Sequence, residues 1–208
     1  ESFFVAPQNA LALAALDGWA TWPEGKMVLT GPRGAGKTHL THVWAAGTRA
    51  QILKAAELTP EAVGAMTHLD AVAVEDGHEI GTLPQAQTAL FHLHNLMREK
   101  ACPILVTGTG PLPGWGLTLP DLASRLTAAP QAVIEEPGDA LLAAVLDKQF
   151  TDRQLSADDT VIRYCLSRME RSFEMAHRFV AEMDRSALAL GRALTVPLAR
   201  KVLDNMDT

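Results

Sequence analysis

The sequence predicts an α/β fold with a parallel sheet between two layers of helices, followed by a small all-helical domain. Two observations predict it. Between residues 26 and 135, short apolar runs typical of buried strands alternate with segments whose apolar residues recur at helical spacing. From residue 138 onward only helical patterns remain. We therefore expect an α/β domain over residues 1–137 and a helical domain over residues 138–208, with the boundary at Pro137 and Gly138.

The elements of the first domain follow from the alternation of patterns. Parallel strands need long crossover connections, and the segments between the apolar runs have the length and spacing of helices. Strands are expected at residues 26–30, 51–54, 71–74, 103–108 and 131–135. Helices are expected at residues 38–46, 60–66, 85–100 and 121–126.

The second domain is expected to be a bundle of four helices. Their sequences are LLAAVLDKQF, DDTVIRYCLSRM, SFEMAHRFVAEMDRSALAL and VPLARKVL, each with apolar residues at helical spacing. Ser156, Asp158 and Asp159 are typical of a helix start, which marks where the second of these helices begins.

The segment GPRGAGKTHL, directly after the first strand, matches the phosphate-binding pattern G-x-x-x-x-G-K-[ST]. Glycines let backbone N–H groups approach phosphates closely, and the N-terminus of the following helix favours an anion. Lys37 would reach the β- and γ-phosphates, and the Thr38 hydroxyl would bind Mg²⁺. The alternative is a tight glycine-rich turn without a ligand. The predicted nucleotide-binding residues of this segment are Gly31, Gly34, Ala35, Gly36, Lys37, Thr38 and His39.

Two later strands end in polar residues that are candidates for the same site. Glu75 and Asp76 follow the third strand, where one acid would help to hold Mg²⁺ and its neighbour would polarise the attacking water. We assign Glu75 to the metal. Thr109, after the fourth strand, would lie between the phosphate loop and the acids and orient that water. The alternatives are two acids capping a strand at the surface and a turn of small residues.

Composition and charge exclude several classes of protein. The net charge is −6, divided as about −5 before residue 138 and −1 after it, so neither part has the basic excess of a nucleic-acid binder. There is no apolar run long enough for a membrane span and no secretory leader pattern, which predicts a cytoplasmic protein. Cys102 and Cys165 are expected to be buried thiols. His92 and His94 would point to different faces of one helix, which argues against a metal site.

Several segments together resemble the DnaA-related AAA+ ATPases, and within them the Hda group of regulatory inactivators of DnaA. The segments are GKTHL, GLTLPDLASRL, ERSFEMAHRFVAEMDRSAL and LTVPLARKVL, and the resemblance covers almost the whole chain. It implies an AAA+ nucleotide-binding domain with a helical lid, ATP or ADP with Mg²⁺ as ligands, and a role in regulating the initiation of DNA replication.

The resemblance also implies roles for residues outside the phosphate loop. Residues 4–9, which include Val5 and Asn9, would line the adenine side of the pocket. Arg171, which would open the third lid helix, matches the arginine of the second sensor. Arg125 in LASRL matches the arginine finger, which acts in trans on a nucleotide held by a neighbouring subunit. A finger of this kind contributes about 10³ to 10⁵ in rate. Without the family, an exposed arginine in a surface ion pair would be the simpler interpretation of Arg125.

The chain departs from the family pattern at both candidate catalytic strand ends. The acidic tip has Glu75 before Asp76 where two aspartates are usual, and Thr109 stands where an aspartate is usual. We therefore expect weak ATP hydrolysis by the chain itself.

The expected partners follow from the resemblance alone. They are the DnaA initiator and the DNA sliding clamp, the latter through a short N-terminal peptide that is missing from the sequence, which begins at Glu1. No DNA-binding domain is expected after the lid, and association between copies of the chain is left open. The competing hypothesis is a binding module, such as a helicase loader or a membrane-targeting adaptor, that uses nucleotide without hydrolysis. A small kinase would need an acceptor pocket that the sequence does not indicate.

Overall fold

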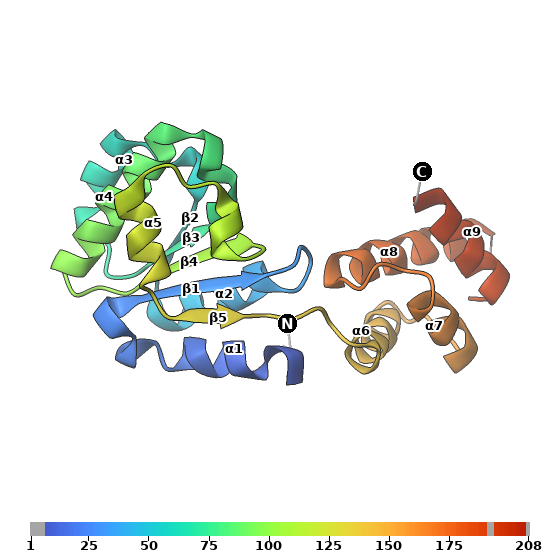
Figure 1. Cartoon of the computed structure of the whole chain (residues 1–208). Coiled ribbons are helices and arrows are strands. Elements are labelled where there is room, and N and C mark those ends of the chain that lie inside the picture. The colour runs from blue at the N-terminus through green and yellow to red at the C-terminus, as the bar shows by residue number, and fades with distance from the viewer. Residues whose placement is uncertain (1–6, 191–193, 207–208) are drawn as a thin grey trace. The chain divides into compact units, whose positions relative to one another are not determined.

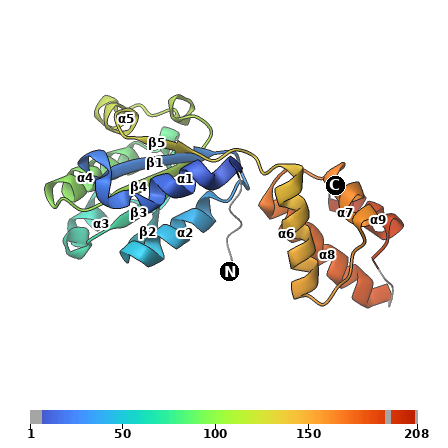
Figure 2. The ribbon, with the colours of Figure 1, turned by 90° about the horizontal axis from the view of Figure 1, so that it is seen from below.

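The computed structural model describes residues 7–190 and 194–206. The chain divides into two compact units, which we call the α/β unit (Asn9–Glu135) and the helical unit (from Glu136 onward), and each has its own hydrophobic core. Figures 1 and 2 show the two units from two directions. The division falls two residues before the boundary that the sequence suggested.

The α/β unit is built on a five-stranded sheet in the order β2-β3-β4-β1-β5. All neighbouring strands are parallel, which confirms the expected fold class. The strands are β1 (Lys26–Gly31), β2 (Gln51–Lys54), β3 (Val72–Glu75), β4 (Ile104–Thr109) and β5 (Gln131–Val133). The carboxyl ends of parallel strands share one edge of the sheet, so the predicted site residues after β1, β3 and β4 lie along the same edge.

Helices precede and connect the strands of this unit. They are α1 (Pro7–Asp17), α2 (Lys37–Thr48), α3 (Pro60–Gly64), α4 (Pro84–Glu99) and α5 (Pro120–Thr127). Proline occupies the first turn of α3, α4 and α5, where its fixed φ favours a helix and its missing N–H costs nothing. The sequence did not predict α1, because its apolar residues run around the whole helix. Leu11 is 83% exposed, whereas Ala12 and Leu16 are buried.

Both faces of the sheet are buried. Strand residues Val28, Val74 and Val106 belong to a core that includes residues of α4 and α5. The neighbouring strand residues Leu29 and Leu105 are also fully buried but lie outside that core, as expected when successive side chains point to opposite faces. Helix α2, which contacts β1, β3 and β4, covers this other face. The apolar runs of the strands are therefore continuous and not alternating.

The helical unit contains four helices among its described residues, as predicted. They are α6 (Asp139–Asp152), α7 (Asp159–Leu166), α8 (Phe173–Leu190) and α9 (Val196–Met206). The Asp158 side chain caps α7 by accepting a hydrogen bond from the Val161 N–H at 2.9 Å. In the core of the unit, the rings of Phe150 and Phe179 meet edge to face with centroids 6.5 Å apart.

Three smaller predictions can be compared with the structure. His94 is buried and His92 is exposed, so the two histidines do lie on different faces of α4. Cys165 is buried, but Cys102 is only half-buried, because it lies in the turn between α4 and β4 and not inside an element. Among the described residues, no helix has the length and apolar character needed to cross a bilayer.

Candidate functional site

The predicted phosphate loop connects the end of β1 to the start of α2. Gly34 and Gly36 have φ values of 69° and 99°, which side chains rarely adopt. Gly31 is needed for a different reason, because a Cβ atom there would lie 2.6 Å from the Ile134 carbonyl oxygen. No side chain caps the N-terminus of α2. The first N–H groups of this helix are therefore open to an anionic ligand.

Lys37, the first residue of α2, is buried beside this loop. Its ammonium donates hydrogen bonds to the carbonyl oxygens of Gly31, at 3.0 Å, and Pro32, at 2.7 Å. Burial lowers the pKa of Lys37, and the negative charge of Asp76 opposes that shift. The joint role of Asp76 and Lys37 at one site remains a prediction.

The acidic end of β3 is occupied by a lysine that the sequence analysis missed. Lys54, the last residue of β2, is in register with Glu75. Its ammonium lies 3.1 Å from Glu75 Oε2 and 2.6 Å from Asp76 Oδ2. These contacts raise the pKa of Lys54, with the Asp76 hydrogen bond as the largest cause. The sequence shows that Lys54 ends a predicted strand, which marks it as a candidate for the same sheet edge. Its ion-pair partners could not be predicted, because they depend on which strands are neighbours.

The residues at this edge fit a divalent cation. Glu75 is buried, and its Oε1 atom has no hydrogen-bond partner among the described residues. A carboxylate oxygen without a hydrogen-bond partner is the kind of ligand that Mg²⁺ prefers. Asp76, His78 and Glu79 also bring one potential ligand atom each within 4.8 Å of one another. Thr38 itself is exposed.

Thr109 ends β4, directly beside the phosphate loop. It is in register with Gly31, and β4 lies between β1 and β3, where the sequence placed it. A second feature here was not predicted, because the Trp115 ring packs over the end of β4. A Cβ atom on Gly108 would lie 2.2 Å from that ring, and the indole N–H donates to the Gly110 carbonyl at 3.2 Å. Trp115 therefore holds the chain that carries Thr109.

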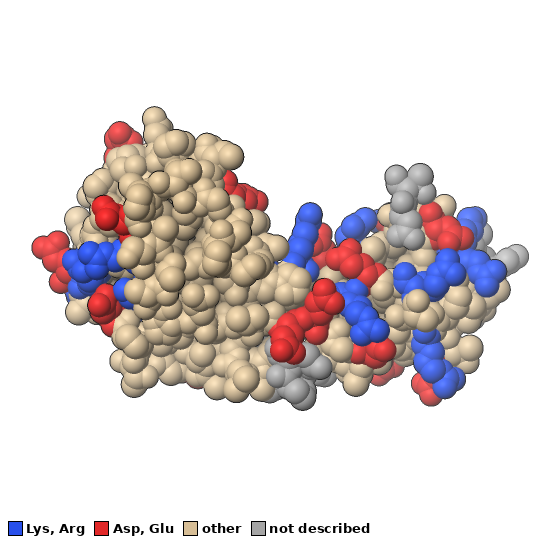
Figure 3. All heavy atoms as spheres, viewed as in Figure 1, with Lys and Arg blue, Asp and Glu red and all other residues tan. Residues whose placement is uncertain are grey.

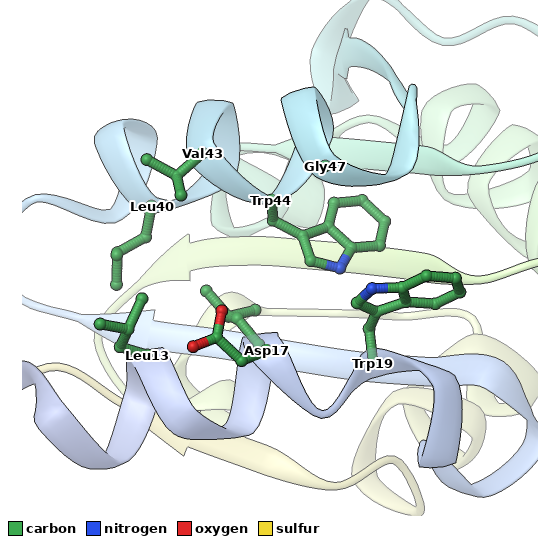
Figure 4. A pocket seen from close by; sticks show the side chains of 8 residues that line it. Leu13, Asp17, Trp19, Leu40, Val43, Trp44 and Gly47 are labelled. Carbon is green, nitrogen blue, oxygen red and sulfur yellow. The ribbon is translucent and has the colours of Figure 1, made fainter. Parts of the chain in front are cut away.

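The residues expected on the adenine side are only partly described. Val5 lies outside the described residues, and Asn9 is buried near the start of α1. Helix α1 packs against α2, and the side chains of Leu13, Asp17 and Trp19 point toward α2 (Figure 4). They line a cavity of about 100 Å³ that includes none of the predicted site residues.

Arg125 lies in the last turn of α5 and is half-buried. Among the described residues it makes no hydrogen bond or ion pair. Its positive charge helps to lower the pKa of Glu24, after the larger effect of Lys26, and that of buried His94, after burial and Lys26. Lys26 is the first residue of β1, whereas the phosphate loop follows the last. At ~3.3 Å per residue, the two ends of β1 are about 17 Å apart. The Pro130 carbonyl, three residues after α5, accepts a hydrogen bond from the Val28 N–H, so Arg125 lies toward the opposite end of β1 from the phosphate loop.

Arg171 belongs to the helical unit. It does not open α8, as the sequence suggested, but lies two residues before the helix begins at Phe173. Ser172 takes the capping position instead, and its hydroxyl accepts a hydrogen bond from the Met175 N–H at 3.0 Å. Arg171 pairs with Asp139 at 3.0 Å and lines a hollow of about 410 Å³ together with Arg163 and Arg168. Its approach to nucleotide phosphates remains a prediction.

We compared the sequence and the fold of the chain with those of known proteins. Residues 139–203 match the family model described as the lid domain of Hda. Domain III of the replication initiation protein DnaA from Thermotoga maritima has the same fold, with a TM-score of 0.78 and 16% identity over 98% of this chain and 94% of that chain.

Two further solved structures share the fold. DnaA from Aquifex aeolicus bound to AMPPCP matches with a TM-score of 0.75 and 16% identity over 99% of this chain and 68% of that chain. A RuvB variant from Thermotoga maritima matches with a TM-score of 0.73 and 17% identity over 97% of this chain and 70% of that chain. Residues 139–203 are therefore an Hda-type lid, and the chain as a whole shares the fold of these DnaA and RuvB structures.

Proposed function

We propose that the protein is a nucleotide-dependent regulator of replication initiation. It binds ATP or ADP in the loop between β1 and α2, and it promotes hydrolysis of ATP bound to the DnaA initiator by presenting Arg125 in trans. The DnaA contact, a contact with the sliding clamp and a cytoplasmic location are parts of this proposal. The single observation that carries it is the position of Arg125, which is unpaired among the described residues and lies toward the opposite end of β1 from its own phosphate loop.

Nucleotide binding is supported by the geometry of the loop. The uncapped start of α2, the positive-φ glycines and the buried ammonium of Lys37 converge on one end of β1. The similar DnaA structure from Aquifex aeolicus holds AMPPCP, an ATP analogue. Within the chain, the Lys37 ammonium contacts only backbone carbonyls among the described residues, and phosphate oxygens would be stronger partners for it.

The remaining residues at the sheet edge have supporting roles in this proposal. Mg²⁺, held by Thr38 and Glu75, would offset the negative charge of the nucleotide phosphates. Asp76 would accept a proton from the attacking water, and Thr109 would orient that water. Arg171 would reach the phosphates from the lid.

The role of Arg125 in trans follows from electrostatics. A guanidinium offers paired donors to phosphate oxygens and stabilises the charge that develops in phosphoryl transfer. A half-buried arginine without a carboxylate partner keeps those donors available to another molecule. Helix α5 ends at Thr127, and the Pro130 carbonyl three residues later accepts a hydrogen bond from the Val28 N–H near the start of β1. Arg125 therefore lies toward the opposite end of β1 from Gly31, which supports a role toward the nucleotide of another molecule.

The test measures two properties of the same variants. Arg125→Ala should retain ADP affinity and lose stimulation of hydrolysis in a DnaA·ATP complex with loaded clamps by about 10² or more. Lys37→Ala should lose ADP binding by about 10² or more, because the loop loses its cation. Calorimetry follows binding, and release of labelled ADP follows hydrolysis.

Arg98→Ala is the matched control for Arg125→Ala. Arg98 is exposed in the last turn of α4 and acts on the same two groups, Glu24 and His94. Normal stimulation by Arg125→Ala would refute the finger. Loss of ADP binding in Arg125→Ala would show that the residue serves its own subunit.

One observation favours a second candidate, a binding module that uses nucleotide without hydrolysis. Both acids that would support hydrolysis are paired with Lys54. A helicase loader or an adaptor would bind ADP with normal affinity, fail to stimulate DnaA, and bind a replicative helicase or another partner directly. Pull-down with purified DnaA and purified helicase distinguishes the two candidates.

A further inference from the structure

We propose that Lys54 is a built-in cation that competes with the divalent metal ion for the acidic end of β3. Its ammonium holds one oxygen of Glu75 and one oxygen of Asp76, so a metal ion that is bound by both carboxylates requires Lys54 to leave. The inference rests on the proposed nucleotide site, and it goes beyond that site by assigning a regulatory role to a residue of β2.

The first support is the geometry of the contact. The Lys54 ammonium lies within 3.1 Å of one oxygen of Glu75 and within 2.6 Å of one oxygen of Asp76. Parallel pairing of β2 with β3 puts Lys54 in register with Glu75, so the backbone holds the base of the side chain beside the acids. A single ammonium thus bridges both residues that were predicted to serve the metal and the water.

The second support is the burial of Glu75. Its side chain is only 4% exposed, and its Oε1 atom lacks a hydrogen-bond partner among the described residues. A buried carboxylate is costly unless a cation or hydrogen-bond donors compensate it. Glu75 therefore needs positive charge in every state of the protein, and either Lys54 or a metal ion can supply it.

The third support is that Lys54 is free to leave. Its side chain is 47% exposed, in contrast to that of Glu75. An ammonium at the surface regains water when it leaves, so the exchange costs the lysine little. One Mg²⁺ carries twice the charge of the lysine and would neutralise both carboxylates, which makes the two cations alternatives at this position.

This competition has a measurable consequence for nucleotide binding. With Lys54 in place, the two carboxylates are partly neutralised, so a nucleotide without metal meets less repulsion. Without Lys54, the acids repel metal-free phosphates and attract the metal more strongly. The wild type should therefore show a weaker dependence of ADP affinity on Mg²⁺ than a variant with a neutral residue at position 54.

The first arm of the test uses Mn²⁺ alone with nucleotide-free protein, followed by electron paramagnetic resonance. Lys54→Met should bind Mn²⁺ about fivefold more tightly than wild type, which is the upper range of what an exposed ion pair contributes. Lys54→Arg should behave as wild type. Lys148→Met is the matched control, because Lys148 forms an exposed ion pair of similar length with Asp152, 2.7 Å, in the helical unit. Lys54→Gln is a second neutral variant should Lys54→Met fold poorly.

A further variant identifies the ligands of the ion. Glu75→Gln added to Lys54→Met should remove the gain in Mn²⁺ affinity. A gain that survives this change would place the ion on the neighbouring group of Asp76, His78 and Glu79 and overturn the inference. Equal Mn²⁺ affinity in Lys54→Met and wild type would overturn it as well.

The second arm measures ADP affinity by calorimetry with Mg²⁺ and with EDTA. The ratio of the affinity with Mg²⁺ to the affinity with EDTA should be about fivefold larger in Lys54→Met than in wild type, because the same ion pair is lost. An unchanged ratio contradicts the competition. Failure of the wild type to bind ADP at all would refute the proposed nucleotide site and leave the Mn²⁺ arm as an independent test of Lys54.

Discussion

Charged side chains are used differently in the two units. The first 137 residues contain 8 basic and 13 acidic residues, and the remaining 71 contain 10 basic and 11 acidic residues. On the face shown in Figure 3, the α/β unit accordingly exposes few charged groups, whereas the helical unit exposes many of both signs. Within the α/β unit, Lys54 and Glu75 stand at the ends of paired strands, where the backbone holds the two charged groups together.

Lysine and arginine illustrate the difference. Lys37 and Lys54 are tied to backbone carbonyls and to paired acids at the sheet edge, and the neighbouring strands define their positions. Arg171 and Arg185 in the helical unit form ion pairs that are largely exposed. Exposed pairs contribute little to stability, so the cations of the helical unit are available for other partners at small cost.

The largest expected effect concerns the separate cores of the two units. Phe179→Ala removes a buried ring from the helical core, which should destabilise the helical unit by about 3–5 kcal/mol. All four tryptophans, Trp19, Trp22, Trp44 and Trp115, lie in the α/β unit. Urea unfolding followed by circular dichroism should therefore shift, while the transition followed by tryptophan fluorescence should stay in place.

Phe179→Leu is the control for this substitution, since it keeps most of the buried volume. If the circular dichroism and fluorescence transitions of Phe179→Ala shift together, the two units unfold as one, and their stabilities are not independent.

A smaller loss of folding stability is expected on acidification, and it should affect the α/β unit. Burial, with help from nearby Lys26, lowers the pKa of His94 from 6.5 to about 4. Between these values the unfolded chain takes up a proton that the folded unit excludes, so stability is lost as the pH falls from about 6.5 toward 4. The loss at pH 5 should be about 2 kcal/mol.

The measurement compares urea unfolding by tryptophan fluorescence at pH 7.5 and pH 5.0. His94→Leu should reduce the difference between the two pH values by most of that amount. An equally acid-sensitive His94→Leu variant would assign the effect to other groups.

The smallest expected change in stability is at Arg171. Its ion pair with Asp139 is about half exposed on both sides, so Arg171→Ala should cost less than about 1 kcal/mol. It should nevertheless weaken ADP binding if the side chain reaches the phosphates as proposed. Urea unfolding by circular dichroism and ADP calorimetry check the two effects separately.

Arg185→Ala is the matched control, because Arg185 forms an exposed pair with Glu182 at 2.7 Å in α8. Equal ADP affinity in Arg171→Ala and Arg185→Ala would contradict the proposed phosphate contact and show that Arg171 is a surface charge like Arg185.

Much of this molecule was determined by local sequence. The strand and helix order, the phosphate loop and the helical second unit follow from apolar spacing and from glycines, which act over a few residues. The acidic end of β3 and the place of Thr109 were predictable for the same reason, because the carboxyl ends of parallel strands meet at one edge. The family resemblance of the lid segment was also readable from the sequence and is confirmed by the match of residues 139–203.

Only the tertiary structure decided which side chains meet at that edge. Lys54 reaches Glu75 because β2 pairs with β3, and Trp115 packs on Gly108 because the turn after β4 folds back over that strand. Arg171 meets Asp139 across the start of two different helices. Helix α1 is held by its contacts with α2, since its sequence has no apolar stripe. Except for Trp115 on Gly108, these contacts join residues far apart in the chain, and short-range patterns carry no information about which distant segments meet.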